Sequence, residues 1–231
     1  MKRFYKEVSV VEAEDGWRVL LDGRAIKTVG GRGQVVPSEA LARAMALEWA
    51  GQGEEIDLTR FIYRDLVDYS LDVIAADPAE AVVALVPYAE TDTLCYRADP
   101  DEALFARQEA VWEPVLSGFE ARHGVRFERV SGIIHRAQPA ETLDFLRARL
   151  EASDPFALAG LRNLASLAAS LVIALEALEE QAEVEALWAA ACVEEEWQAD
   201  LWGRDWEAEE RREKRAAAFA ATVEFVRLAR G

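Results

Sequence analysis

The sequence is poor in the residues from which metal sites and disulfide frameworks are built. Its 231 residues include two cysteines, Cys95 and Cys192, and two histidines, His123 and His135. The cysteines are too far apart for a Cys-x-x-Cys site, and so few of them favour a reduced compartment. The histidines form neither a His-x-x-x-His nor a His-Glu-x-x-His pattern, so a zinc site has no support. We therefore expect no metal site.

The common signatures of enzymes are also missing. Residues 30–33 are glycine-rich, but they lack the Lys-Ser/Thr ending of a phosphate-binding loop and lie between expected strands, so a hairpin turn is the better interpretation. The sequence contains no Gly-x-Ser-x-Gly elbow, and no Ser/His/Asp group can be nominated. We therefore expect no catalytic residues and no enzymatic activity. The alternative is a small-molecule hydrolase or transferase that uses carboxylate pairs and Thr91-Asp92.

Basic residues are in deficit, and long apolar runs are absent. The chain has 43 acidic and 26 basic residues, a net charge of −17. Such a surface repels phosphate groups, so we expect no binding to nucleic acid or to anionic membranes. The longest uncharged apolar run, residues 163–175, falls short of the ~20 residues that span a bilayer, and the N-terminus has no apolar signal core. We expect a soluble intracellular protein of the cytoplasm.

Apolar periodicity predicts a β-rich N-terminal part and a helical C-terminal part. Residues 4–36 contain alternating runs separated by turn signals such as Asp22-Gly23, and Ser38 is the expected N-cap of a first helix. From about residue 58 the period is helical, except over residues 125–130, which alternate and should return to the N-terminal sheet. This predicts an α+β fold with a small N-terminal β-rich domain over residues 1–57, joined by strand 125–130, and a larger C-terminal α-helical bundle over residues 58–231.

Three helices are expected near the C-terminus. One begins at Pro155 and carries leucines at helical spacing up to Leu178, so it should be the central buried helix. The next two, over residues 182–202 and 205–229, are separated by Gly203.

The most informative stretch is acidic and rich in tryptophan. Residues 176–210 contain 13 acidic residues, one basic residue and four of the seven tryptophans. On a helix, Glu194 and Glu195 interrupt apolar stripes, whereas Glu196 shares a polar side with Asp200. A carboxylate among aromatic residues must be paired or face a partner, because burying a lone charge is costly. The functional interpretation is a protein-docking surface where Glu195 meets a basic group on a client; the alternative is a solvated acidic face with the tryptophans in the core.

Ordered sequence blocks resemble one family, the assembly chaperones for the catalytic head of F-type ATP synthase (the "ATP-twelve" family). The blocks lie at residues 4–8, 16–28, 36–37, 46–57, 88–98, 108–114 and 195–203. They include Ala46-x-Glu48-Trp49, Thr91-Asp92-x-Leu94-Cys95 and Glu195-x-Trp197-Gln198-x-x-x-Trp202-Gly203. Two departures are Val29 where the family has proline and Asp68 where it has asparagine; we assign no function to Asp68.

The resemblance implies a β-containing N-terminal domain, a C-terminal helical bundle and a role without ATPase activity or cofactor. That role is to bind the unassembled α subunit of the ATP synthase head, to prevent its aggregation and to hand it over to the β subunit. We expect a monomer, and we expect the client to be bound by Glu195, Trp197, Gln198 and Trp202, followed by Trp49, Thr91 and Asp92. Trp49 could instead be a structural residue. A third possibility is a permanent structural subunit of a complex, which would co-purify stoichiometrically.

Overall fold

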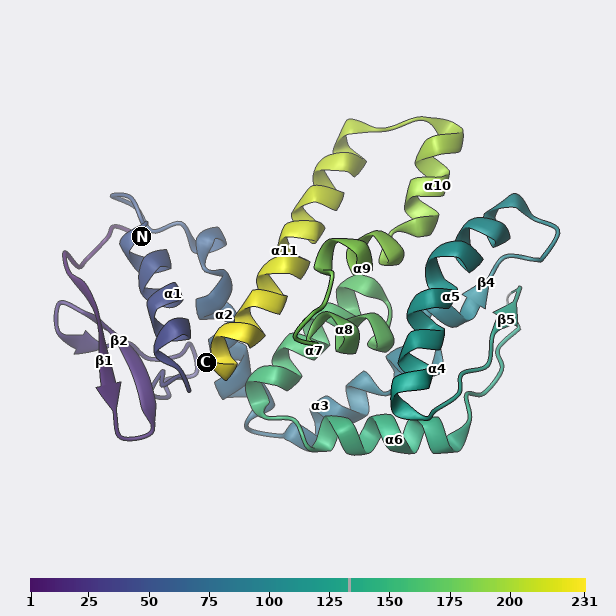
Figure 1. The fold of residues 1–231 in the computed structure, drawn as a ribbon. Coiled ribbons are helices and arrows are strands. Elements are labelled where there is room, and N and C mark those ends of the chain that lie inside the picture. Colours follow the sequence, from purple (N-terminus) through teal and green to yellow (C-terminus); the bar gives the residue numbers. More distant parts are fainter. Residues whose placement is uncertain (133) are drawn as a thin grey trace. The chain divides into compact units, whose positions relative to one another are not determined.

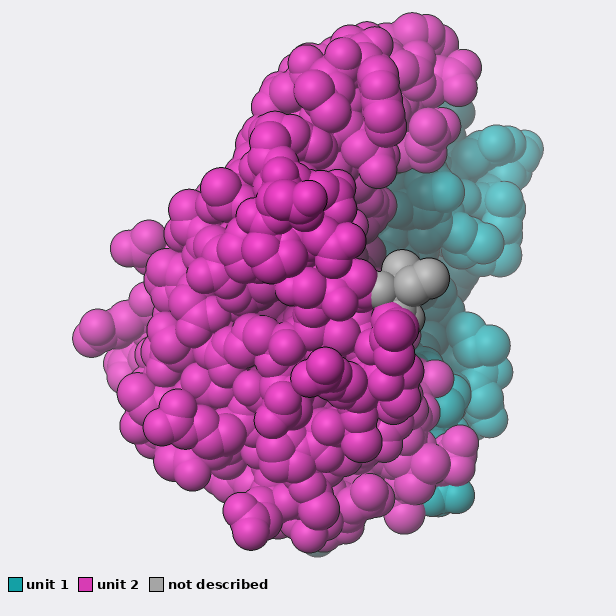
Figure 2. Space-filling model, turned by 90° about the vertical axis from the view of Figure 1, so that its right-hand side faces the viewer, with its two compact units in different colours: residues 1–78, 154–160, 221–231 teal, residues 79–153, 161–220 magenta. Residues whose placement is uncertain are grey.

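The computed structural model describes residues 1–132 and 134–231, and it confirms the predicted α+β fold (Figure 1). The chain forms two compact units, coloured separately in Figure 2. Residues 1–78, 154–160 and 221–231 make up the first unit, and residues 79–153 and 161–220 make up the second. The first unit therefore includes residues 58–78 and two short segments that the sequence analysis placed in the helical domain.

A small antiparallel sheet opens the first unit. Its strands are β1 (Val8–Ala13), β2 (Gly16–Leu21) and β3 (Arg24–Ala25), in the order β1-β2-β3. The β1–β2 turn needs glycine at position 16, because its φ is +141° and an added Cβ would lie 2.3 Å from the carbonyl oxygen of Val36. Residues 34–36 form only an isolated bridge, in which Val36 pairs with Trp17, and not the short strand that their sequence suggests.

Helix α1 (Glu39–Ala50) covers the sheet, as Figure 1 shows. Its N-cap is Ser38, whose hydroxyl oxygen accepts a hydrogen bond from the backbone N–H of Leu41 at 3.0 Å. The apolar face of α1 then places Leu41, Met45 and Trp49 in the core of this unit.

Carboxylates of the first unit hold its loops. The next elements are η1 (Leu58–Arg60), α2 (Ile62–Tyr69) and the π-helical turn η2 (Ser70–Ile74). Asp72 accepts hydrogen bonds from the hydroxyl of Thr28 and the N–H of Gly30, both at 2.7 Å, and Asp68 accepts one from the N–H of Val29 at 3.2 Å. Asp68, which departs from the family pattern, therefore fixes the glycine-rich turn.

The second unit is mainly helical. Its elements, with α3, α7 and α11 contributing residues to both units, are α3 (Pro78–Leu85), α4 (Pro87–Glu90), η3 (Thr93–Cys95), β4 (Tyr96–Arg97), α5 (Ala103–His123), β5 (Val130–Ser131), α6 (Ala140–Glu151), α7 (Pro155–Ala168), α8 (Leu171–Ala177), α9 (Val184–Ala191), α10 (Val193–Trp202) and α11 (Trp206–Arg230). None of the helices in the described part of the chain is both long and apolar enough to cross a membrane.

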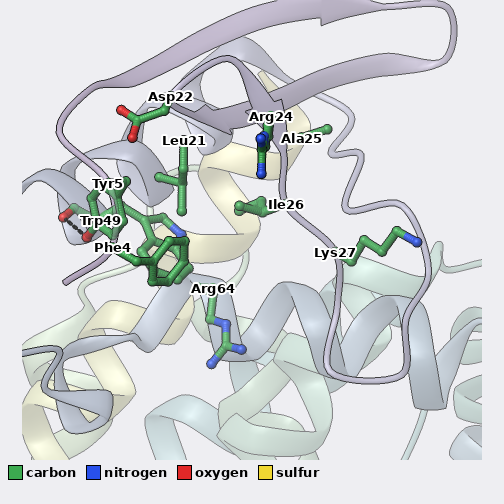
Figure 3. Close-up of a pocket in the computed structure, with 10 residues that line it drawn as sticks. All are labelled: Phe4, Tyr5, Leu21, Asp22, Arg24, Ala25, Ile26, Lys27, Trp49 and Arg64. Atoms are coloured by element: carbon green, nitrogen blue, oxygen red, sulfur yellow. Dashed lines mark hydrogen bonds between the residues drawn. The ribbon is translucent and has the colours of Figure 1, made fainter. Parts of the chain in front are cut away.

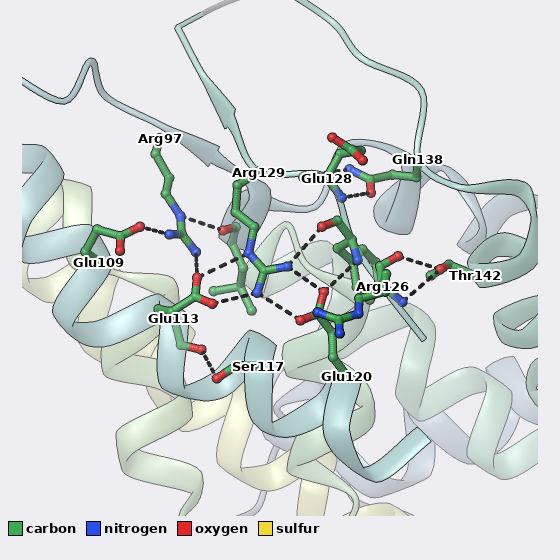
Figure 4. Close-up of polar contacts among 12 residues, drawn as sticks. Arg97, Glu109, Glu113, Ser117, Glu120, Arg126, Glu128, Arg129, Gln138 and Thr142 are labelled. Carbon is green, nitrogen blue, oxygen red and sulfur yellow. Dashed lines mark hydrogen bonds and ion pairs between the residues drawn. The ribbon is translucent and has the colours of Figure 1, made fainter. Parts of the chain in front are cut away.

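The expectation that residues 125–130 join the N-terminal sheet is wrong. Only Val130–Ser131 is a strand, and it pairs in parallel with β4 in a separate two-stranded sheet. An ion-pair network fixes this sheet on α5 (Figure 4). Glu113 accepts hydrogen bonds from Arg97 and Arg129, each at 2.7 Å, and Arg129 also pairs with Glu120. The Arg129 and Arg97 guanidinium groups hold the pKa of the Glu113 carboxyl below its usual range.

The helix expected over residues 155–178 is interrupted. Ala169 has φ +50°, a left-handed conformation that ends α7. Ser170 then starts α8, because its hydroxyl oxygen accepts a hydrogen bond from the N–H of Ile173 at 2.9 Å. A second break, at Cys192, divides the helix expected over residues 182–202 into α9 and α10.

Candidate functional site

Helices α10 and α11 form a hairpin in the second unit, and residues 195–215 of this hairpin are called the tip. Figure 1 shows α10 beside the N-terminal part of α11. The turn uses Gly203 at φ +92°, a conformation that glycine adopts without strain. The sequence predicted this boundary correctly.

The end of this hairpin exposes large apolar side chains. Leu201, Trp202 and Trp206 are 58%, 78% and 71% exposed. Single exposed apolar residues are common, but three large ones close together in sequence at one turn are typical of an interaction surface. The alternative of tryptophans packed in the core therefore does not hold for Trp202 and Trp206.

A hollow of about 400 Å³ lies between the two helices. Three of the four predicted α10 residues line it, namely Glu195, Gln198 and Trp202. Arginines line the opposite wall, which α11 supplies: Arg211, Arg212 and Arg215. The surface therefore combines an aromatic edge, an amide and charges of both signs.

Glu195 already has a basic partner in its own chain. Its carboxylate accepts a hydrogen bond from Nη1 of Arg215 at 2.6 Å. Arg215 is itself held, because its Nη2 donates to the carbonyl of Leu167 at 3.1 Å and its guanidinium lies 5.3 Å from the ring centroid of Trp188. Both charged side chains remain partly exposed, at 49% for Glu195 and 40% for Arg215. A basic group on a client would therefore share Glu195 with Arg215 or displace it.

Glu196 and Asp200, which share a polar side of the helix as the sequence predicted, are ion-paired. Glu196 pairs with Arg212 and with Arg204, the latter at 2.8 Å. Asp200 accepts a hydrogen bond from Arg107 of α5 at 2.7 Å, and this contact holds the pKa of Asp200 below its usual value.

Trp197 packs differently from the other predicted α10 residues. It is half-buried, and the guanidinium of Arg107 lies 5.9 Å from its ring centroid. Trp197 therefore supports the contact of α10 with α5.

Trp49 lies in the core of the first unit, where it is 8% exposed. Its ring contacts those of Tyr5 and Phe61, with centroid separations of 5.5 Å and 4.5 Å. Its backbone carbonyl accepts a hydrogen bond from the hydroxyl of Tyr5 at 2.6 Å. These contacts favour the structural interpretation of Trp49.

The predicted client contact at Asp92 is corrected to a structural role. Asp92 is fully buried, and its carboxylate accepts hydrogen bonds from the N–H groups of Leu94 and Val172 at 3.1 Å and 3.0 Å. Burial raises its pKa to about 6 despite these bonds. A client or a small substrate cannot reach this carboxyl in the present structure. Thr91 is exposed, and its hydroxyl donates to the carbonyl of Pro87 at 3.0 Å.

Residues 1–132 and 134–231 contain no group of three or more His, Cys, Asp and Glu side chains that could hold a metal ion. Both thiols are buried, and burial raises their pKa values, that of Cys192 to about 11. Trp206 and the arginines of α11 were not among the contact residues that the sequence predicted. The sequence signal that could have identified these arginines is the basic run of residues 211–215, which begins just after the acidic stretch and could pair with it.

Comparison with known proteins gives concordant matches. A family model described as ATP12 chaperone protein matches residues 2–120. The solved structure of Atp12 from Paracoccus denitrificans superposes with a TM-score of 0.93 at 33% identity and covers 99% of this chain and 98% of its own. The solved structure of a candidate chaperone from Agrobacterium tumefaciens superposes with a TM-score of 0.93 at 37% identity and covers 98% of this chain and 85% of its own. The mitochondrial protein atp12 of Schizosaccharomyces pombe is 26% identical over 184 residues; the match covers 74% of this chain and spans 63% of the yeast protein.

Proposed function

The chain belongs to the ATP12 chaperone family, as its sequence blocks predicted, and we propose that it binds the unassembled α subunit of the F-type ATP synthase head. In this proposal it keeps the α subunit from aggregating and releases it to the β subunit. It acts as a cytoplasmic monomer and hydrolyses no ATP. The observation that carries the proposal is the exposed apolar tip.

The tip has the composition of a contact surface. Trp202 and Trp206 offer two rings with most of their area open to solvent, and tryptophan is enriched among the residues that dominate binding energy. Burying one such ring removes about 200 Å² from water, which is about 5 kcal/mol before the costs of association. Two rings and Leu201 can therefore supply most of the affinity of a transient complex.

The charges beside the rings set the specificity. Glu195 and Arg215 lie partly exposed on facing helices, so a client can add its own charged group to the pair. Exposed pairs contribute at most about 1 kcal/mol, and exchanging them costs little. Charge complementarity at such a rim mainly sets the orientation of the complex and its rate of formation.

Release follows from competition. The proposed client surface is the apolar face of the α subunit that the β subunit later covers, because such a face aggregates when it is exposed. The β subunit shifts the equilibrium by mass action, which requires that the chaperone bind more weakly than the β subunit does.

The first experiment measures aggregation of purified α subunit by light scattering, without nucleotide, with and without this protein. We expect suppression near one-to-one stoichiometry and reversal on addition of β subunit. Unchanged scattering, with the α subunit eluting separately in gel filtration, would contradict the proposed client. Release of phosphate from ATP by the protein alone would contradict the absence of hydrolysis.

A second experiment locates the site. The double variant Trp202→Ala/Trp206→Ala should need an at least about tenfold higher concentration than wild type to suppress aggregation of the α subunit. Its melting temperature should be unchanged, because both rings are exposed. The matched control is Leu47→Ala, which removes a 73% exposed apolar side chain from α1 of the other unit. Equal protection by the double variant and the control would place the client elsewhere.

A further inference from the structure

A second hollow, of about 590 Å³, lies within the first unit (Figure 3). The N-terminal segment, the turn between β2 and β3, the following residues, α1 and α2 all contribute to its lining. Its volume is in the range of clefts that bind small ligands or peptide side chains. It is lined by residues other than those of the tip.

The floor of this hollow is apolar. It consists of the rings and methyl groups of Tyr5, Leu21 and Trp49, which are 4%, 4% and 8% exposed and therefore held in place by packing. Phe4 is 64% exposed, and its ring meets the edge of Tyr5 with centroids 5.3 Å apart. An apolar side chain entering the hollow would gain contact with the floor and also cover Phe4.

One buried donor in the floor has no partner. The indole Nε1 of Trp49 is buried and makes no hydrogen bond among the described residues. The nearby hydroxyl of Tyr5 donates to the Trp49 carbonyl at 2.6 Å and makes no hydrogen bond with this indole N–H. More than nine in ten buried N–H groups are paired, so this orphan donor of a lining residue marks a place where an acceptor from outside would form a hydrogen bond once it displaces the side chains that cover the N–H.

The rim is basic. Arg64 is occupied, since it pairs with Asp65 at 2.9 Å and with Asp68 at 3.4 Å. Arg24 and Lys27 are exposed, and neither has a carboxylate within 4.0 Å in the described part of the chain. The remaining charged lining residue is Asp22, whose carboxylate accepts hydrogen bonds from the N–H groups of residues 6 and 7 at 3.0 Å and 2.8 Å and also interacts electrostatically with Arg24. One carboxylate beside Arg24 and Lys27 leaves the rim with an excess of positive charge.

This basic rim stands out against the charge of the chain. Residues 1–36 contain seven basic and five acidic residues, whereas the whole chain has a net charge of −17. An acidic partner that most of the surface repels would therefore be attracted to the sheet and the hollow beside it.

We propose that this hollow is a second docking site, which binds an extended peptide segment carrying an aromatic or aliphatic side chain flanked by carboxylates. The apolar side chain enters the floor, a carbonyl oxygen of the segment accepts a hydrogen bond from the Trp49 indole, and the carboxylates pair with Arg24 and Lys27. The segment belongs to a client protein, and the site does not depend on that client being the α subunit.

The test uses the full chain and a fluorescein-labelled short peptide with one phenylalanine between acidic residues. Its matched control replaces every acidic residue of the peptide with lysine. Fluorescence anisotropy should show saturable one-to-one binding of the acidic peptide and at least about tenfold weaker binding of the lysine peptide. Absent binding of the acidic peptide, or equal binding of the two, would overturn the proposal.

Variants then locate the peptide. Arg24→Glu/Lys27→Glu should weaken binding at least about tenfold. Arg136→Glu/Arg147→Glu changes the net charge equally at two exposed arginines of the second unit, and should leave binding within about twofold. Equal losses in the two double variants would mean that only net charge matters and would overturn the proposal.

Two further measurements test the role of the Trp49 indole N–H and whether a second copy of the chain occupies the hollow. Trp49→Phe keeps the aromatic floor and removes the N–H, so it should bind the peptide several-fold more weakly; circular dichroism checks that it folds. Self-association that Arg24→Glu/Lys27→Glu abolishes would assign the hollow to a second copy of the chain and overturn the client segment. Failure of the α-subunit assay with peptide binding intact would reject the proposed function alone.

Discussion

Replacing Asp92 with alanine should destabilise the chain by about 2–6 kcal/mol. The carboxylate of Asp92 is fully buried, and the N–H groups of Leu94 and Val172 donate to it at 3.1 Å and 3.0 Å. Without it, each buried N–H would lack an acceptor at a cost of about 1–3 kcal/mol. Urea denaturation followed by circular dichroism measures the difference in unfolding free energy.

A matched control separates burial from capping. Asp154 also accepts two hydrogen bonds from backbone N–H groups, those of Phe156 and Ala157 at 2.8 Å and 3.0 Å, but it is exposed. Asp154→Ala should cost only about 1 kcal/mol, the usual value for an N-cap, because water can replace the lost acceptor. Equal losses for the two variants would refute the reasoning from burial.

The stability difference between wild type and Asp92→Ala should also depend on pH, with a sign that follows from the pKa of Asp92. Burial raises the pKa of Asp92 to about 6, above the unfolded value of about 3.9, so the folded state holds this proton more tightly. The pH-dependent part of the contribution of Asp92 to stability is therefore fully present below about pH 4 and is lost as the pH rises through 6. The difference in unfolding free energy between wild type and Asp92→Ala should grow by about 2 kcal/mol from pH 7 to pH 4. A difference that shrinks on acidification would refute the raised pKa.

Three further predictions follow from local packing. Glu195→Lys should weaken protection of the α subunit while changing the unfolding free energy by less than about 1 kcal/mol, because its ion pair is exposed; full protection by this variant would remove Glu195 from the site. Gly160→Ala should destabilise the chain by about 1–3 kcal/mol, because the new Cβ would lie 2.2 Å from a buried valine of α11. Gly118→Ala, whose new Cβ has no atom within 4 Å, should stabilise it by about 0.5–1 kcal/mol. Thermal denaturation in which Gly160→Ala is more stable than wild type, or Gly118→Ala is less stable, would refute this packing. Cys95 and Cys192 are buried with raised pKa values, so a thiol reagent should react only after unfolding, and rapid reaction of one equivalent with native protein would contradict their burial.

Local signals predicted the sheet and the first helix well. The strand alternation, the Asp22-Gly23 turn and the Ser38 cap each act within a few residues, so the sequence carries them directly. Tertiary contacts decided the elements that were missed. Alanine at position 169 gives no sign of a helix break, yet its carbonyl accepts hydrogen bonds from the N–H and the hydroxyl of Thr93 at 3.1 Å and 2.9 Å.

The candidate site was only partly predictable for a similar reason. The sequence identified Trp202 and Glu195 through their setting in an acidic stretch, but exposure depends on packing between elements. Tryptophan at helical spacing is equally compatible with a core position, as Trp49 shows. The basic partner of Glu195 lies 20 residues further along the chain and meets it only because α11 turns back beside α10.

Amide hydrogen exchange of the protein, alone and in complex with purified α subunit, shows whether the tip is the surface that meets the client. We expect slower exchange over residues 195–215, where the tip would be covered, and unchanged exchange in α6, which carries none of the proposed contacts. A stable complex whose protection lies outside residues 195–215, with none at Trp202 and Trp206, would contradict this expectation.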